Sequence, residues 1–247
     1  MSEPTRRLAV LGGGDPAAAI RSAVDSAAAS LVDRAEADAV VAVGDAALRE
    51  AMLAAAGEDG RSVPILPVGD GRHAVAPDLA ADRIAAADGA GGSASAVDGF
   101  SRVAHPVLAV DGAGDGRRRF AAADVAFVTA EAARISEYGI AFTDGESVSV
   151  RADGAVIATP LGSDGYAAAA GGPVVSPGGG LSVVPVSPFT TRPDTWVASG
   201  GVRVTVEREE EPVALVVDGD RRGTVEPHRT VGVEVATTVD LLSATAE

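Results

Sequence analysis

The sequence contains no cysteine and only three histidines, and both shortages limit the metal chemistry open to the protein. Without cysteine there can be no disulfide, no thiolate nucleophile and no cysteine-ligated zinc or iron–sulfur site. With so few histidines, a centre built from several imidazoles is also disfavoured. No residue of the sequence is therefore singled out as a metal ligand.

Lysine, asparagine and glutamine are also missing, so all 20 basic side chains are arginines, against 35 acidic ones, and the formal net charge is −15. A negative molecule repels phosphate backbones and anionic lipids, which disfavours nucleic-acid and membrane partners. The acidic excess predicts a halophilic protein in a salt-rich cytoplasm, where ionic strength screens self-repulsion; coding bias is an alternative explanation of the arginine-only usage. No apolar run approaches the roughly 18 residues of a membrane span, so we expect a cytoplasmic protein.

The first hundred residues alternate between short apolar runs and segments with helical spacing. The runs are continuously apolar and end in glycine-containing turns; they are Leu8–Leu11, Ala39–Val43 and Pro64–Val68. Continuously apolar strands followed by helices indicate a parallel sheet covered on both faces. The pattern predicts a Rossmann-like α/β domain over residues 1–104, with a flexible loop at the small-residue tract 88–95.

Beyond residue 104 the pattern changes to short β-type segments separated by glycine, aspartate and proline. The predicted strands are Val107–Val110, Asp124–Thr129, Gly139–Thr143, Ser147–Arg151, Ala155–Ala158, Leu181–Pro185, Val202–Glu207, Val213–Val217 and Val231–Val235. Segments of this length and punctuation are typical of an all-β sandwich-like domain, here residues 105–247. A short helix is predicted among the strands, within Ser163–Gly172.

Three glycine-rich turns follow the apolar runs of the first domain, at Gly12–Asp15, Gly44-Asp45 and Gly69–Gly71. In an open parallel sheet, ligands bind beyond the carboxyl ends of the strands, so these turns are expected to share a site. Glycine allows the backbone to approach a phosphate, and the following helix offers free N–H groups. Helix capping is the alternative explanation for Asp15 and Asp45.

The most specific string lies in the second half of the chain. It reads Arg151-Ala152-Asp153-Gly154, a strand, then Thr159-Pro160-Leu161-Gly162-Ser163-Asp164-Gly165-Tyr166, and ends with Gly171-Gly172-Pro173. It resembles the NAD kinase family, which carries R-x-D-G, T-P-T-G-S-T-A-Y and G-G-P in the same order. Further stretches that fall on family motifs are Val41–Leu48 on G-G-D-G-T-L, Ala122–Val125 on L-N-E/D-V, Pro185–Pro188 with Arg192-Pro193 on P-I-x-P-H-S-x-x-x-R-P, and Val217–Gly219 on a late D-G turn.

The resemblance implies a fold and an activity. The fold is a Rossmann-like N-terminal domain followed by a C-terminal β-sandwich. The activity is transfer of the γ-phosphoryl group of ATP, or of phosphate from polyphosphate, to the 2′-hydroxyl of the adenosine ribose of NAD. Mg²⁺ is implied as cofactor, because clustered carboxylates and a triphosphate cannot otherwise be brought together. A homo-oligomer, dimer or tetramer, is implied as well.

The resemblance also implies roles for single residues. Asp45 would be the catalytic carboxylate facing the 2′-hydroxyl, Asp124 would hold ribose hydroxyls, and Asp153 would accept a hydrogen bond from the nicotinamide amide. Tyr166 would pack against the dinucleotide. The other cofactor-binding positions implied by the family loops are Gly44, Gly162, Ser163, Asp164 and Gly165.

Several motif positions depart from the family pattern. Ala46 and Ala47 replace a glycine and a threonine, Ala123 replaces an asparagine, and Phe189 stands where the family has histidine. A Cβ at position 46 restricts positive φ angles. These departures leave open a catalytically impaired paralogue that binds NAD(P) or another nucleotide. A kinase for a different hydroxyl group is a third hypothesis, against which the intact R-A-D-G string argues.

Overall fold

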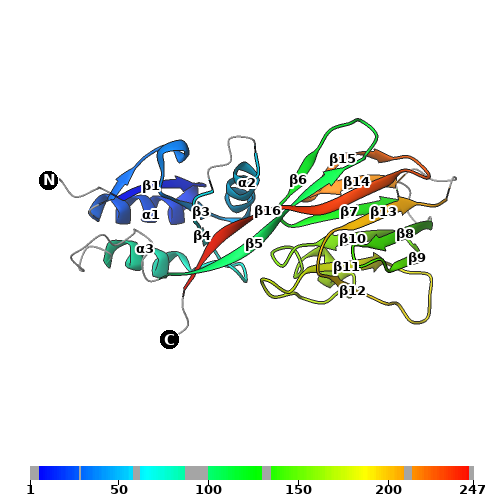
Figure 1. The fold of residues 1–247 in the computed structure, drawn as a ribbon. Helices are drawn as coiled ribbons and strands as arrows, with labels where there is room; N and C mark the ends of the chain where they lie inside the picture. Colours follow the sequence, from blue (N-terminus) through cyan, green and yellow to red (C-terminus); the bar gives the residue numbers. More distant parts are fainter. Residues whose placement is uncertain are drawn as a thin grey trace. The chain divides into compact units, whose positions relative to one another are not determined.

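The computed structural model describes residues 6–27, 29–57, 62–86, 100–129, 135–208 and 213–244; the predicted loop 88–95 lies outside them. The chain divides into two compact units (Figure 1). Unit 1 contains residues 1–104 and 239–247, and unit 2 contains residues 105–238. The predicted fold class, an α/β unit together with a β-sandwich-like unit, is confirmed.

Unit 1 is built on a parallel sheet. Its elements before residue 100 are β1 (Arg6–Leu11), α1 (Gly14–Ser26), β2 (Ala29–Leu31), the 3₁₀ helix η1 (Arg34–Glu36), β3 (Ala39–Val43), α2 (Asp45–Ala55), β4 (Ile65–Val68) and α3 (Pro77–Ala86). The strands lie in the order β2-β1-β3-β4, and each neighbouring pair is parallel. Ile20 and Val24 of α1 and Ile84 of α3 are buried together with apolar strand residues, because helical spacing places them on one face.

The C-terminal end of the chain also belongs to unit 1, although sequence analysis places it in the second domain. Strand β16 (Thr230–Ala244) starts in unit 2, and its residues from Val239 onward lie in unit 1. Leu241 pairs in parallel with Ile65 of β4, and Leu242 is buried in the core of unit 1. Burial of these apolar side chains explains why the strand continues beyond the predicted segment.

Unit 2 is made of antiparallel strands. Its elements are β5 (Phe100–Asp111, which begins in unit 1), β6 (Arg119–Ala121), β7 (Asp124–Thr129), β8 (Ser136–Phe142), β9 (Ser147–Ala152), β10 (Gly154–Ala158), α4 (Tyr166–Ala169), β11 (Leu181–Val186), β12 (Trp196–Ala198), β13 (Val202–Val206), β14 (Val213–Val217) and β15 (Asp220–Val225). One sheet has the order β12-β11-β10-β7-β14-β15, and the other contains β16-β13-β8-β9.

The core of unit 2 lies between these two sheets. Phe127 and Ile157 of the first sheet are fully buried together with Tyr138 and Ile140 of the second. The opposite face of the first sheet is covered by the one-turn helix α4, whose Ala167 packs into an apolar cluster with residues of β7, β10 and β11. Small side chains under α4 therefore place its first residue, Tyr166, on the outer face of this sheet. No helix within the described ranges is long and apolar enough to cross a membrane.

Candidate functional site

The glycine turns of unit 1 lie together at the carboxyl ends of its strands, because β1, β3 and β4 are neighbouring parallel strands. The Gly44 N–H donates to the Val68 carbonyl oxygen at 2.9 Å, which ties the turn after β3 to the end of β4. Gly12 lies against the end of β3, where a Cβ would overlap the Val43 carbonyl oxygen. The structure thus brings the three predicted turns together.

Asp45 is the first residue of α2, and it is exposed at the carboxyl ends of these strands. The residue before it, Gly44, occupies the N-cap position with φ 86°, a conformation that favours glycine. A Cβ on Gly71 would lie 3.8 Å from Asp45 Oδ1, so the carboxylate faces the turn after β4. In the described part of the chain, no hydrogen bond of the Asp45 carboxylate is found.

Helix capping therefore does not explain the two aspartates that follow glycine turns. In α1 the N-cap residue is Gly13, and Asp15 lies inside the first turn, as Asp45 does in α2. In both helices a glycine occupies the N-cap position and has the non-helical backbone conformation, and the aspartate follows it inside the helix. A carboxylate in the first turn still interacts favourably with the helix dipole.

The structure accommodates the two alanines that follow Asp45 without backbone strain. Both lie within α2, so the left-handed backbone of this turn falls on Gly44 and position 46 has no positive φ. The Ala46 methyl group is exposed, whereas Ala47 is buried at 5% exposure. The expected conflict between a Cβ at position 46 and a positive φ angle does not arise.

In unit 2, Asp124 and Asp153 stand at opposite ends of two paired strands. Asp124 starts β7 and pairs with Ala158, the last residue of β10, whereas Asp153 directly precedes β10. Positions 153 and 158 are five residue steps apart in extended chain, so the backbone positions of the two aspartates are separated by roughly 17 Å. Both aspartates are half-buried.

Tyr166 lies within electrostatic reach of both carboxylates. The pKa of its hydroxyl is raised, first by partial burial and then by the negative charges of Asp153 and Asp124. Its side chain remains 40% exposed. The structure therefore brings together Asp124, Tyr166 and Asp153, which form an elongated polar row on unit 2.

The loop before Tyr166 is held by buried contacts with its own chain. A Cβ on Gly162 would overlap the Ala123 carbonyl oxygen and lie 2.6 Å from its carbonyl carbon, so only glycine fits here. Ser163 is fully buried, and its Oγ accepts from the Val175 N–H at 2.9 Å and donates to the Pro160 carbonyl oxygen at 3.0 Å. Of the remaining predicted positions, Asp164 and Gly165 are exposed.

These contacts predict a stability effect for Ser163→Ala. Removing the hydroxyl deletes its buried hydrogen bonds with the Val175 N–H and the Pro160 carbonyl oxygen, which costs about 1–3 kcal/mol in the free energy of unfolding. Denaturant unfolding measures this loss. Ser149→Ala is the matched control, because the Ser149 hydroxyl is exposed and donates to Glu137 and Glu207. Equal stability losses in the two variants would contradict a structural role of the Ser163 hydroxyl.

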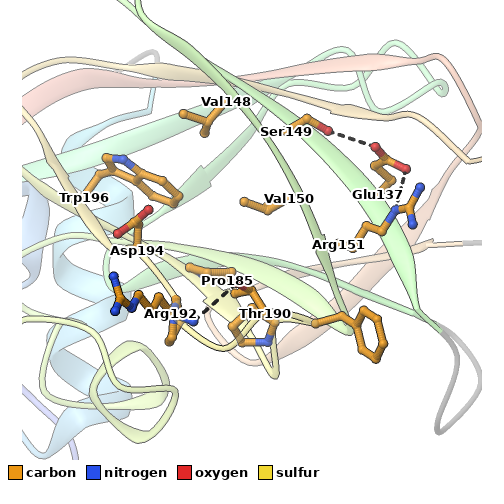
Figure 2. Close-up of a pocket in the computed structure, with 13 residues that line it drawn as sticks. Glu137, Val148, Ser149, Val150, Arg151, Pro185, Thr190, Arg192, Asp194 and Trp196 are labelled. Atoms are coloured by element: carbon orange, nitrogen blue, oxygen red, sulfur yellow. Dashed lines mark hydrogen bonds and ion pairs between the residues drawn. The ribbon is translucent and has the colours of Figure 1, made fainter.

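A pocket of about 630 Å³ lies elsewhere on unit 2, between strand β9 and the segment after β11 (Figure 2). Arg151 Nε donates to Glu137 Oε2 at 3.1 Å on one side, and Trp196, the single tryptophan, forms part of the wall. The residues that line the pocket are Glu137, Val148, Ser149, Val150, Arg151, Pro185, Pro188, Phe189, Thr190, Arg192, Pro193, Asp194 and Trp196. None of Asp124, Asp153 and Tyr166 is among them, so the pocket is distinct from the polar row.

Asp218 is the residue of this region that sequence reasoning did not place among the site residues. Its carboxylate accepts hydrogen bonds from the backbone N–H groups of residues 122–124, the segment that carries the Asp124 side chain. The sequence carries a hint in the Asp218-Gly219 dipeptide directly after the predicted strand Val213–Val217, because Asp-Gly favours a hairpin turn. Nothing in the sequence connects that hairpin with residues almost a hundred positions earlier.

Comparison with known proteins matches the second half of the chain to a protein family. Residues 123–241 match the ATP-NAD kinase C-terminal domain. An NAD kinase of Methanosarcina acetivorans is 34% identical over 107 residues, which are 42% of this chain and 39% of that protein. An NAD kinase of Gemmatimonas aurantiaca is 35% identical over 176 residues, 66% of this chain and 56% of that protein. The matched part of the chain thus spans two fifths to just over half of the length of these relatives.

Two solved structures share the fold over nearly the whole chain. An NAD kinase from Archaeoglobus fulgidus in complex with ATP has a TM-score of 0.68 at 22% identity, covering 96% of this chain and 92% of that one. A yeast NADH kinase complexed with NADH has a TM-score of 0.70 at 15% identity, covering 98% and 84%. At these identities the likeness establishes the fold of both units together with their connectivity.

Proposed function

We propose that the chain, whose residues 123–241 match the ATP-NAD kinase C-terminal domain, acts as a member of the NAD kinase family. It transfers the γ-phosphoryl group of ATP to the 2′-hydroxyl of the adenosine ribose of NAD, giving NADP. The observation that carries this proposal is the polar row of unit 2. A dinucleotide is a long ligand with a ribose near one end and a nicotinamide amide at the other. Two aspartates whose backbone positions stand roughly 17 Å apart, at opposite ends of the paired strands β7 and β10, suit such a ligand together with a partly exposed tyrosine within electrostatic reach of both.

Each residue of the row has a task that follows from its chemistry. The Asp124 carboxylate accepts hydrogen bonds from ribose hydroxyls, and the Asp153 carboxylate accepts one from the nicotinamide amide. The Tyr166 ring offers an exposed apolar face against which the dinucleotide packs. The Tyr166 hydroxyl is protonated near neutral pH, as a tyrosine ordinarily is, so it can donate a hydrogen bond.

We assign the acceptance of the 2′-hydroxyl proton to Asp45. Its carboxylate is exposed and faces the turn after β4, and the N-terminus of α2 beside it offers free N–H groups that suit phosphate oxygens. The reaction needs little covalent chemistry from the protein, so positioning and neutralisation of phosphate charge dominate. We place this chemistry in the cytoplasm, with a homo-oligomer as the working form.

Mg²⁺ fits this donor set as an ion that enters with the triphosphate. No cluster of three or more potential metal ligands occurs in the portion of the chain that the structure describes. Mg²⁺ typically keeps several waters and takes one or two carboxylates in addition to substrate phosphates, and Asp45 is the carboxylate available at the glycine turns. The ion supplies charge neutralisation on the phosphates.

The direct test is formation of NADP by the purified protein. With ATP, Mg²⁺ and NAD in molar KCl, which screens the net charge of −15, we expect NADP to accumulate with time and to depend on ATP. Binding of NAD is measured in parallel by calorimetry. NAD binding without NADP formation would contradict the kinase activity and leave a binding module, and absence of any binding would contradict both.

A further inference from the structure

Asp218 lies in the tight turn between β14 and β15. Asp218 has φ 50° and Gly219 has φ 83°, and Val217 pairs with Asp220 across them. Two consecutive residues in the left-handed region form a type I′ turn, which is the favoured two-residue connection of a β-hairpin. Aspartate tolerates this conformation better than most residues, so the turn itself accounts for an aspartate at position 218. It does not account for where the carboxylate points.

The carboxylate of Asp218 binds three consecutive backbone N–H groups of another segment. Oδ2 accepts from the Ala122 N–H at 2.9 Å, and Oδ1 accepts from the Ala123 N–H at 2.7 Å and the Asp124 N–H at 3.2 Å. The Asp218 N–H donates in return to the Asp124 carbonyl oxygen at 3.0 Å. Hydrogen bonds to an ionised acceptor are about twice as strong as neutral ones, so this contact fixes the backbone firmly.

Thr159 holds the carbonyl groups of the same segment. Its Oγ1 lies 2.8 Å from the Ala122 carbonyl oxygen and 3.0 Å from that of Ala123, and its N–H donates to the Ala123 carbonyl oxygen at 2.9 Å. Residues 122–124 are therefore bound through their N–H groups by Asp218 and through two carbonyl groups by Thr159. Such a doubly anchored turn has little freedom to adjust its position.

The anchored turn presents one polar side chain. Ala122 and Ala123 carry methyl groups, so Asp124 supplies the only side chain of the turn that can hydrogen-bond to a ligand. Asp124 is half-buried and acts electrostatically on Tyr166. The direction in which its carboxylate leaves the sheet depends on the backbone that Asp218 holds.

We propose that Asp218 is a positioning residue of the dinucleotide site, which acts by fixing residues 122–124 and so aims the Asp124 carboxylate at the ribose of NAD. This inference rests on the proposed function, since it names the residue that orients one contact of that site. Asp218 acts through Asp124 and touches no substrate. Its effect therefore falls first on the binding of the dinucleotide and reaches the phosphoryl-transfer step only through the ribose that Asp124 holds.

Asp218→Asn tests this role. The amide keeps one acceptor oxygen but turns an NH₂ group toward a backbone N–H, so the grip on residues 122–124 is lost in part. We expect both the KM and the calorimetric Kd for NAD to rise about tenfold, with a smaller fall in kcat. Hydrogen exchange of the amides of residues 122–124 should become faster. If Asp218→Asn fails to fold, Asp218→Ser, which keeps a hydroxyl acceptor, takes its place.

A matched control exists in the same unit. Asp144-Gly145 forms the turn between β8 and β9, and Asp144 Oδ1 accepts from the Glu146 N–H at 3.1 Å within its own turn. Asp144→Asn should leave the KM for NAD unchanged. If the two variants weaken NAD binding equally, or if Asp218→Asn binds NAD as tightly as the parent chain, the proposal is wrong.

A double-mutant cycle with Asp124→Asn separates positioning from general stabilisation. If Asp218 acts through Asp124, the double variant should bind NAD no more weakly than Asp124→Asn alone. Additive losses, or a lower melting temperature and kcat with an unchanged KM, would overturn the inference. Should the parent chain bind NAD without making NADP, the proposed kinase activity fails, while the Kd values still decide the role of Asp218.

Discussion

Asp45→Asn should lower the rate of NADP formation at least about 100-fold, because it removes the group that accepts the hydroxyl proton. The amide has nearly the shape of the carboxylate but cannot take up a proton near neutral pH. The Asp45 side chain is exposed, so the substitution leaves the packing of α2 intact. NAD affinity should stay within about twofold, since Asp124, Asp153 and Tyr166, which we assign to binding of the dinucleotide, lie in unit 2. Initial rates and calorimetry measure the two quantities.

Asp15→Asn provides a control in the same kind of position. Asp15 also lies in the first turn of a helix that follows a glycine turn of unit 1. Both substitutions therefore lose a similar favourable interaction with a helix dipole, about 0.3–1 kcal/mol. Asp15→Asn should keep nearly full activity. The catalytic assignment would be wrong if Asp45→Asn retained a third of the parent activity. It would also be wrong if Asp15→Asn lost as much activity as Asp45→Asn.

Gly162→Ala should destabilise unit 2 by about 2–3 kcal/mol, because the new Cβ meets backbone atoms that cannot move aside easily. The Cβ would lie 2.6 Å from the Ala123 carbonyl carbon, in a turn already held by Asp218 and Thr159. In a chain of this length the loss corresponds to a fall in melting temperature of about 4–12 °C. Calorimetric or circular-dichroism melting curves measure it. NAD affinity should fall as well, since Asp124 belongs to the displaced turn.

Gly232→Ala is the control for this substitution. Gly232 lies in β16 of the same unit, and a Cβ there would meet nothing within 4 Å. Alanine in a strand costs less conformational entropy than glycine, so Gly232→Ala should leave stability unchanged or raise it by up to about 1 kcal/mol. A Gly162→Ala protein that melts like the Gly232→Ala protein would contradict the tight contact at Ala123.

The strands that the sequence predicts well are those with a strong apolar character. Asp124–Thr129 and Val213–Val217 are observed with the predicted bounds, and both strands lie inside a sheet. The missed strands β2, β6, β12 and β15 each pair with a single neighbouring strand, and β15 carries Asp220, Arg221 and Arg222, which are exposed. Such strands form because the adjacent strand of the sheet offers backbone hydrogen bonds. The local sequence pattern does not reveal this partner.

The predicted helix within Ser163–Gly172 is shorter in the structure, where α4 spans Tyr166–Ala169. Ser163 belongs to the preceding turns because its hydroxyl is bound to Pro160 and Val175. The polar row could be predicted from motifs, since Asp124, Asp153 and Tyr166 stand in recognisable strings. Asp218 could not, because its partners lie 94 to 96 positions earlier in the chain.

The path of β16 has a consequence for synthesis of the chain on the ribosome. Unit 1 receives its last strand from residues 239–244, which are made only after all of unit 2. Until then the start of β4 at Ile65 lacks its partner strand on one side, whereas Val68 at the other end of β4 is already bridged to Val75. Open edges of this kind invite pairing with other chains. A nascent chain of this protein therefore depends on its final strand to close a surface that would otherwise be prone to aggregation.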